Sequence, residues 1–348
     1  MTTWTTSTKS QNGMCMDNSV SKHYEQMKWI IARAELTDEN KRGSLSYQKP
    51  KSSSTFDMHE RVSGLHLGLR SANLPDVLSW LKSFKIDMYG YNHLEEKIPG
   101  SCLPDIGIHW DEYECEPMSS TVHTVLEFMQ QHRNRTPVVF ENEYWYHQKL
   151  AVRTIKQLDD LAKDDLLIIS VPFYANFKNH PNIDDLLSRC TEIGVPVVLD
   201  LIWLPLTKEV IKLAHTDCVE VITHSISKML PMAGMKGGFA YWKKPVSKEQ
   251  SLYPLGNKLI YHIGKRFIDE FGYHHARDKF VPYQNKWCKI FGLEQHDLCY
   301  VGRIPKGHWL EKDNLHAHEF DMGDKLFNLV PYMENDDILS KFLHDNRQ

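Results

Sequence analysis

The chain has 348 residues, of which 41% are hydrophobic, enough to build the core of one large domain and of a smaller one. Lysine and arginine total 41 against 45 aspartate and glutamate residues, so the formal net charge is −4, and no dense basic stripe is present. These features argue against a nucleic-acid-binding protein, and we expect no nucleic-acid partner.

The first 60 residues are polar, and we interpret residues 1–60 as an N-terminal arm with one helix over His23–Glu35. Met1–Ser19 lacks the apolar centre of a signal peptide, and the longest apolar runs are far shorter than the ~20 residues that a membrane helix needs. The seven cysteines are scattered, with no CxxC pair. We therefore expect a cytoplasmic protein with no membrane partner and no disulfide framework.

Residues 61–245 have the pattern of a large domain that begins with helices. Apolar residues recur at helical spacing from Leu74 to Leu81, which predicts a helix there. A second helix is predicted over Thr121–Arg133, with an apolar stripe formed by Val122, Val125, Leu126 and Met129.

Short apolar runs rich in β-branched residues follow in the same domain. They predict buried strands at Thr136–Phe140, Leu166–Val171, Pro196–Leu201 and Val219–Thr223. Helices predicted over Asn182–Ile193 and Thr207–His215 separate these strands. Strands that alternate with helices indicate an α/β fold with a mixed, mostly parallel sheet and helices on both faces.

Residues 246–348 have a less regular pattern, which we interpret as a small C-terminal α+β domain. The spacing predicts a helix near Leu255–Phe271, a strand over Lys325–Val330 and a closing helix over Asp336–Asp345.

Two charged residues far apart in the sequence suggest a cofactor site. The apolar run VPVVLD ends on Asp200, and a carboxylate at the end of a buried strand is costly unless a cation meets it. After the next predicted strand comes Ser225–Lys228, followed eight residues after the lysine by Lys236 and a pair of glycines.

These residue types fit pyridoxal 5′-phosphate. The pyridine nitrogen of this cofactor pairs with a carboxylate, which would be Asp200, and the protonated ring accepts electrons from the substrate's α carbon. Its aldehyde forms an imine with a lysine amine, which would be Lys228. Its phosphate needs hydroxyl groups, backbone N–H groups and a cation, for which Ser225 and Lys236 are suited.

Further candidate ligands precede these motifs. Ser119, Ser120 and Thr121 stand directly before or at the start of a predicted helix, whose N-terminus favours a phosphate. Tyr144, with Trp145 as second choice, follows a predicted strand, where an aromatic ring could stack on the pyridine ring.

Here the sequence resembles the class I/II aminotransferase family of pyridoxal phosphate enzymes, which have fold type I. Ser225–Lys228 with Lys236 and its glycines is similar to the family's cofactor-lysine motif, and VVLD is similar to its pyridine-nitrogen strand. Met88–Tyr91, followed by Ile98-Pro99, is similar to the segment whose tyrosine reaches the phosphate of the neighbouring subunit. The resemblance therefore implies a fold type I transferase-like architecture, a homodimer and a cofactor contact from Tyr89.

The sequence also departs from the family's pattern. Lys236 stands in place of the usual arginine, which replaces a bidentate contact to phosphate by a point charge. Pro172–Asn176 replaces the Asn-Pro-x-Gly turn, and Trp203 replaces the tyrosine three residues after the aspartate. The candidates for a hydrogen bond to the cofactor's ring hydroxyl are Asn176, Tyr174 and Trp203.

The family's arginine for the substrate carboxylate is missing as well, since its place corresponds to Asn328. The lost charge-assisted pair would be worth ~1.5–3 kcal/mol. Either Arg303 substitutes for that arginine or the substrate is not a common α-amino acid held in the usual way.

The resemblance implies an aminotransferase that acts on a small amino acid or amine through an imine on Lys228 and a quinonoid stabilised by Asp200. Two alternatives stay open: a lyase or cyclase that eliminates at the β or γ carbon, and a degenerate cofactor-binding protein. The histidines of His316–Glu319 and His274-His275 have no third ligand at a recognisable spacing, so we expect no metal site.

Overall fold

The structure is a computed structural model, and it describes residues 75–83, 98–230, 237–243, 257–308, 310, 317–319, 325–334 and 336. All of these residues belong to one unit that spans Pro50–Asp336. Tyr89, Lys236, the helix predicted over His23–Glu35 and the closing helix beyond Asp336 lie outside the described residues. The proposed division at residues 60 and 245 stays a prediction.

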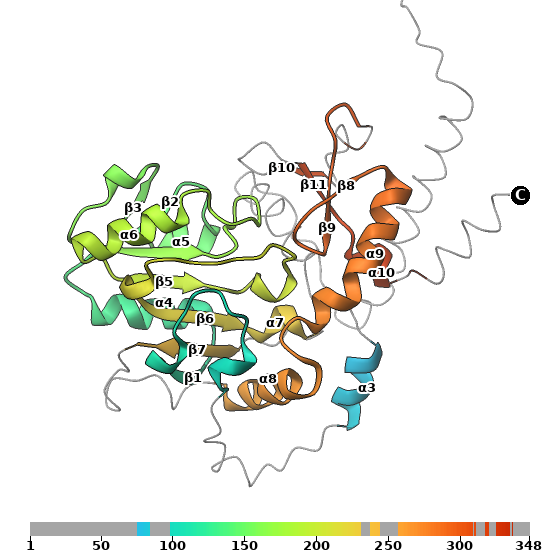
Figure 1. The fold of residues 1–348 in the computed structure, drawn as a ribbon, viewed down its shortest axis with the longest axis horizontal. Helices are drawn as coiled ribbons and strands as arrows, with labels where there is room; N and C mark the ends of the chain where they lie inside the picture. Colours follow the sequence, from blue (N-terminus) through green and yellow to red (C-terminus); the bar gives the residue numbers. More distant parts are fainter. Residues whose placement is uncertain are drawn as a thin grey trace, which may run out of the picture. The chain divides into compact units, whose positions relative to one another are not determined.

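A seven-stranded mixed sheet dominates the described fold, with strand order β1-β7-β6-β5-β4-β2-β3 (Figure 1). The five strands from β6 to β3 run parallel, and β7 is antiparallel to both of its neighbours. The strands are β1 (Glu114–Met118), β2 (Thr136–Phe140), β3 (Arg153–Ile155), β4 (Asp165–Ser170), β5 (Val197–Asp200), β6 (Val219–Ser225) and β7 (Gly238–Trp242). The predicted mixed, mostly parallel sheet is confirmed.

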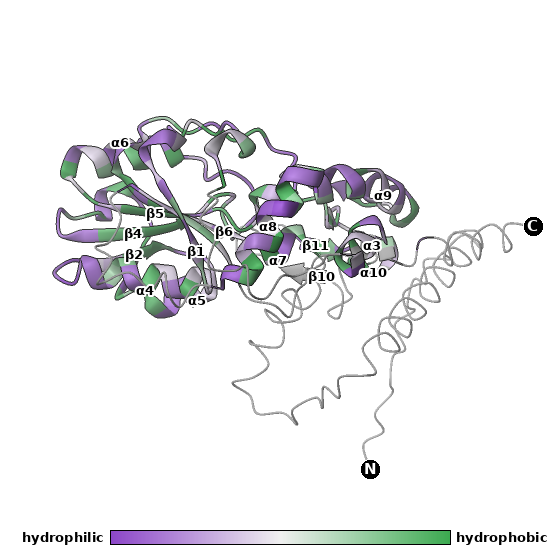
Figure 2. Ribbon diagram, turned by 90° about the horizontal axis from the view of Figure 1, so that it is seen from below, coloured by the Kyte–Doolittle hydropathy of each residue, from purple (hydrophilic) through white to green (hydrophobic). Residues whose placement is uncertain are grey.

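The central strands form where the sequence has continuous apolar runs. All six residues of β4 and all four residues of β5 are buried, because helices cover both faces of the sheet and leave no solvent-facing side. Helices α4 (Thr121–Gln131) and α5 (Trp145–Leu150) lie on one face, and α6 (Ile183–Ile193) lies on the other (Figure 2).

The helix boundaries follow ordinary capping rules. The Ser120 side chain accepts a hydrogen bond from the backbone N–H of His123 at 3.2 Å, which caps the start of α4. Helix α6 begins with Asp184 and Asp185, whose charges suit the helix dipole. It ends at Gly194, whose φ of 71° is the left-handed conformation that glycine adopts most readily.

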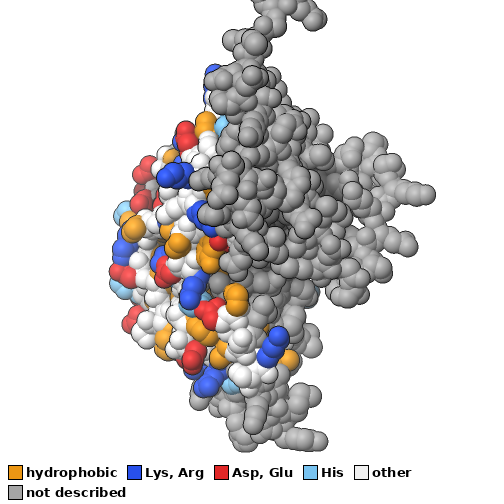
Figure 3. All heavy atoms as spheres, turned by 90° about the vertical axis from the view of Figure 1, so that its right-hand side faces the viewer, with side chains coloured by type: hydrophobic (Ala, Val, Ile, Leu, Met, Phe, Trp, Pro, Cys, Tyr) orange, Lys and Arg blue, Asp and Glu red, His pale blue; other side chains and the backbone are white. Residues whose placement is uncertain are grey.

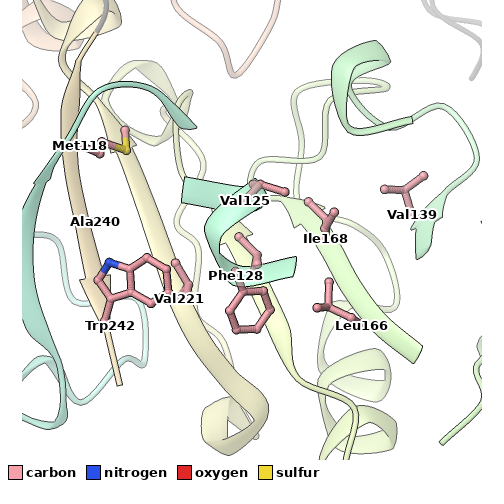
Figure 4. Close-up of a cluster of buried hydrophobic side chains, with 10 residues drawn as sticks. Met118, Val125, Phe128, Val139, Leu166, Ile168, Val221, Ala240 and Trp242 are labelled. Atoms are coloured by element: carbon pink, nitrogen blue, oxygen red, sulfur yellow. The ribbon is translucent and has the colours of Figure 1, made fainter. Parts of the chain in front are cut away.

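Helix α4 contributes to the core beneath the sheet (Figure 4). Val125 and Phe128 pack against side chains of β4 and β6 such as Leu166 and Val221. The predicted apolar stripe is wrong in part, because Leu126 is 42% exposed and Phe128 takes the buried position. The stripe is shifted because the sheet, rather than hydrophobicity alone, decides which side of the helix is covered.

The helix predicted over Thr207–His215 is also wrong. Thr207 forms a β-bridge with Leu298, and the Leu213 N–H donates to the carbonyl of Ile106 at 2.8 Å. The Ala214 N–H is bound by the Asp184 side chain at 2.7 Å. The segment is irregular because its backbone donors are satisfied by distant partners, and contacts of this kind override the local helical spacing.

A second, four-stranded antiparallel sheet has the order β10-β11-β9-β8 (Figure 1). Its strands are β8 (Glu294–Gln295), β9 (Val301–Arg303), β10 (Ala317–Glu319) and β11 (Lys325–Asn328). The remaining helices include α3 (Pro75–Ser83), α7 (Ile226–Met229), α8 (Lys258–Phe271), α9 (His275–Phe291) and α10 (Val330–Glu334). The helix predicted near Leu255–Phe271 and the strand predicted over Lys325–Val330 therefore form, each shorter than expected.

The distribution of charged side chains on the surface and the length of the apolar helices both bear on which partners the protein could bind. On the described part of the face in Figure 3, acidic and basic side chains are interspersed rather than gathered by sign. No helix within the described ranges is both long and apolar enough to cross a membrane.

Phe128 and Leu126 provide a matched test of the core. We expect Phe128→Ala to lower the free energy of unfolding by ~3–5 kcal/mol, because the side chain is fully buried. Leu126→Ala on the same helix should cost less than about 1 kcal/mol, because that side chain is 42% exposed. Urea denaturation followed by circular dichroism measures both, and equal losses would contradict the assigned helix face.

Candidate functional site

Polar side chains converge at the carboxyl ends of the parallel strands. Ser170, the last residue of β4, pairs in register with Asp200 at the end of β5, and Asp200 pairs with Thr223 of β6. Glu143 follows β2 and reaches the same edge, since its carboxylate accepts hydrogen bonds from Ser170. The carboxyl edge of such a sheet is where ligands bind in open α/β folds.

Asp200 is almost completely buried, with 2% of its surface exposed. Its Oδ1 accepts hydrogen bonds from the Thr223 hydroxyl and from the Ile202 N–H, each at 3.1 Å. Burial raises the pKa of Asp200 to about 7. No lysine or arginine of the described ranges forms an ion pair with this carboxyl, so a bound cation would stabilise its charged form.

Lys228 lies on the short helix α7, directly after β6, and is 7% exposed. Its Nζ lies 4.2 Å from the centre of the Trp203 ring, a cation–π distance. Trp203 is itself buried and stands three residues after Asp200. The fold thus brings the predicted lysine to the segment that begins at the predicted carboxylate.

Aromatic rings connect the proposed stacking residue with this lysine. The ring of Tyr144 lies 5.2 Å from that of Tyr174, and Tyr174 lies 5.5 Å from Phe177. Phe177 in turn lies 5.1 Å from Trp203. Phe177 also has a φ of 53°, an uncommon backbone conformation for a bulky residue and one that is often found at functional sites.

The hydroxyl residues predicted to bind phosphate lie around Gly238 of β7. Met118 at the end of β1 and Ser225 at the end of β6 both pair with Gly238, one on each side of it. Ser119–Thr121 follows Met118 directly, so this segment and Ser225 are close in space although far apart in sequence. A side chain at Gly238 would place its Cβ 2.0 Å from a backbone oxygen of β6, so glycine is required there.

Three other predicted site residues are held by local contacts. Asn176 is buried, and its Oδ1 accepts a hydrogen bond from the Lys178 N–H at 3.0 Å. Arg303 forms an exposed cross-strand ion pair with Glu294. The Asn328 side chain accepts a hydrogen bond from the Val330 N–H at 3.0 Å. The contacts shown for Arg303 and Asn328 thus belong to the smaller sheet and the residues next to it.

Two further buried residues of this edge, Glu143 and His147, were not predicted from the sequence and are 1% and 0% exposed. His147 Nε2 lies 3.4 Å from Oδ2 of Asp200, and its Nδ1 lies 4.0 Å from Oε1 of Glu143. Burial lowers the pKa of His147 to about 3 and raises the pKa of Glu143. The available signal in the sequence was an acidic residue and a histidine four residues apart, directly after a predicted strand.

No protein-family model and no curated protein matches the sequence. Solved structures do match it. Cystalysin from Treponema denticola, whose structure contains pyridoxal 5′-phosphate, superposes with a TM-score of 0.54 at 13% identity, covering 85% of this chain and 97% of that one. The chain has the fold of this enzyme.

Two further structures support the same assignment. Tyrosine aminotransferase from Leishmania infantum gives a TM-score of 0.51 at 11% identity, covering 84% of this chain and 100% of that one. The 4-hydroxyphenylacetaldehyde synthase of Rhodiola rosea gives a TM-score of 0.54 at 11% identity, covering 94% and 97%. The architecture is fold type I, as the resemblance implied, and at these identities the similarity concerns the fold alone.

Asp200→Asn tests the buried carboxyl in the protein without added ligand. Since the pKa of Asp200 rises from 3.8 to about 7 on folding, the wild type should lose stability as the pH increases between these values. The slope is at most ~1.4 kcal/mol per pH unit. Urea unfolding should therefore show that the free energy of unfolding of Asp200→Asn increases relative to that of the wild type between pH 4.5 and 7.

Asp105→Asn is the matched control, because Asp105 is exposed and its ion pair with Lys212 lowers its pKa. That variant should show no such gain over the same range. Equal pH slopes for the wild type and Asp200→Asn would contradict a raised pKa at Asp200.

Proposed function

We propose that the chain is a pyridoxal phosphate-dependent enzyme that transfers the amino group of a small amino acid or amine. The observation that carries the proposal is a buried carboxyl, Asp200, at the end of β5 and a buried lysine, Lys228, just after the neighbouring strand β6 of a fold type I sheet. Core packing does not explain Asp200, since burial of a carboxylate is costly and no lysine or arginine of the described ranges pairs with it.

The residues present fit the cofactor at each of its polar ends. The pKa of Asp200 is raised, and its carboxyl has no lysine or arginine partner in the described ranges. Such a carboxyl suits a protonated pyridine nitrogen. Lys228 suits the aldehyde, and Ser119–Thr121 with Ser225 suit the phosphate around Gly238. Lys236, two residues before Gly238 in the sequence, would supply the phosphate's cation.

When bound, pyridoxal phosphate supplies a protonated pyridine ring that draws electrons from the bonds at the substrate's α carbon. Asp200 would keep the ring nitrogen protonated. The amine of Lys228 would hold the aldehyde carbon, then leave it to the substrate's amine and move a proton between the α carbon and the cofactor.

The surrounding aromatic residues would orient the ring and exclude water. Tyr144, with Trp145 as the alternative, would pack on its face. Trp203, Tyr174 and Asn176 are the candidates to hydrogen-bond the ring hydroxyl. We further propose a cytoplasmic homodimer in which Tyr89 reaches the neighbouring subunit's phosphate, as the family resemblance implies.

Elimination at the β or γ carbon is the second candidate reaction. It is favoured by the ion pair between Arg303 and Glu294 and by the local hydrogen bond of Asn328. An α-carboxylate would have to compete with Glu294 for Arg303, which weakens the case for an ordinary α-amino acid aminotransferase.

Lys228→Ala tests the cofactor site. The wild type should show a visible absorption band with pyridoxal phosphate, and borohydride reduction should label Lys228. The variant should lose both signals and on the order of 10²–10⁴-fold in activity, because the amine carries the proton. Lys212→Ala, at an exposed lysine paired with Asp105, is the matched control and should behave like the wild type.

A colourless wild type that borohydride does not label would exclude the proposed enzyme and favour a protein that has lost the cofactor. A second measurement separates the two reactions. With a panel of amines and keto acids, transfer yields one amino product for each keto acid consumed. Elimination instead releases ammonia and a keto acid from a single substrate, and that outcome would replace transfer by the second candidate.

A further inference from the structure

Glu143, His147 and Asp200 form a row of buried titratable groups. The imidazole lies between the two carboxyls, with Nε2 3.4 Å from Oδ2 of Asp200 and Nδ1 4.0 Å from Oε1 of Glu143. These are ion-pair distances, and neither ring nitrogen has a hydrogen-bond partner among the described residues. Buried polar groups are nearly always hydrogen-bonded, so a small closing movement that satisfies both nitrogens is favoured.

Glu143 is suited to hold either a charge or a proton. Its carboxylate accepts hydrogen bonds from the Ser170 N–H at 2.9 Å, the Ser170 hydroxyl at 2.6 Å and the Tyr144 N–H at 2.7 Å. These donors favour the ionised form, whereas complete burial favours the protonated form. The two influences oppose each other, so an added or removed charge nearby can decide between the two forms.

The number of protons in the row follows from its geometry. Each ring nitrogen faces a carboxyl oxygen, so two hydrogen bonds need two protons shared among the three groups. One of the two protons is the ring proton of the neutral imidazole, so the imidazole, two carboxylates and the second proton carry one negative charge in total. The same two protons can occupy different atoms of the row without any change in that charge.

We propose that Glu143 is a positioning residue that accepts a proton from Asp200 through His147 when a cation binds beside Asp200. Without the cation, Glu143 is ionised, His147 carries its proton on Nδ1, and Asp200 is protonated towards Nε2. With the cation, the Asp200 proton moves to Nε2 and the Nδ1 proton moves to Glu143. The negative charge thereby shifts to Asp200, and no proton leaves the row.

The other titratable groups around the row do not compete for these protons near neutral pH. Burial raises the pKa values of the Tyr144 and Tyr174 phenols well above that of an exposed tyrosine, so both phenols keep their protons. Tyr144 also packs its ring edge-on to His147 at 5.2 Å. Ser170 and Thr223 contribute neutral hydroxyls, and the amine of Lys228 lies over Trp203.

The identity of the cation rests on the proposed function, where it is the protonated pyridine nitrogen. The row of Glu143, His147 and Asp200 does not rest on the proposed function, because its geometry is present in the protein without any ligand. A purely structural role for Glu143, joining the end of β4 to the start of α5, would leave the protons of His147 unaffected by substitution. The position of the imidazole proton therefore distinguishes the two roles.

The test is ¹⁵N NMR of the full-length chain labelled with [¹⁵N]histidine, with the His147 signals assigned by their absence in His147→Gln. The probe is 4-deoxypyridoxine phosphate, which offers the ring and phosphate without an aldehyde for Lys228. In the wild type we expect Nδ1 to be protonated before the probe and Nε2 after it. In Glu143→Gln, Nδ1 should keep its proton with the probe bound, because an amide cannot accept it.

Glu141→Gln is the matched control, since Glu141 lies two residues away and is exposed in an ion pair with Lys156. It should switch like the wild type. Ser170→Ala provides a second variant should Glu143→Gln not fold. It removes one donor to Glu143 and should move part of the Nδ1 proton to that carboxyl before any probe is added.

Three outcomes would overturn the proposal: a wild-type His147 protonated on Nε2 without the probe, a wild type that binds the probe without a change of proton position, or a switch that persists in Glu143→Gln. Failure of the probe to bind, measured by ³¹P NMR, would instead count against the proposed cofactor site. The proton position in the probe-free wild type and in Ser170→Ala would then still decide for or against the row.

Discussion

The carboxyl of Asp200, held at the buried end of β5, imposes the electrostatic condition that the rest of the site has to meet. The strand register places Asp200 between Ser170 of β4 and Thr223 of β6, and two hydrogen-bond donors hold one of its carboxyl oxygens. Burial raises its pKa to about 7, so the charged form depends on what binds beside it. A ligand with a positive charge in a ring of suitable shape would meet this condition, which is why we propose a pyridine cofactor.

Fold type I architecture places the other groups within reach of that carboxyl. Parallel strands end at one edge, so loops after β2, β4, β5 and β6 deliver their side chains to the same place. The antiparallel strand β7 adds Gly238 between the two hydroxyl segments. A sheet whose central strands β4 and β5 are fully buried thus supports residues that lie on short helices and irregular segments, a common arrangement for binding sites.

Further side chains adjoin the segment that begins at Asp200 or the Asp200 carboxyl itself. Trp203, which has no phenol, packs against the amine of Lys228 and against Phe177. Glu143 and His147 extend the electrostatics of Asp200 into the protein and make its charge depend on two further groups. Arg303, which is proposed to contact the substrate, is paired with Glu294, so a substrate carboxylate would have to compete with Glu294 for it.

The sequence alone was enough to predict the central strands, because β4 and β5 are continuous apolar runs of the kind found in a sheet covered on both faces. It also indicated Asp200 and Lys228, since charged residues at strand ends stand out locally. It failed for Thr207–His215, whose backbone is satisfied by distant partners, and for Glu143 and His147, whose meaning depends on a neighbour 57 and 53 residues later in the chain. Only tertiary structure decides which polar groups share one buried volume, because their pKa values and proton positions depend on distance and desolvation rather than on sequence order.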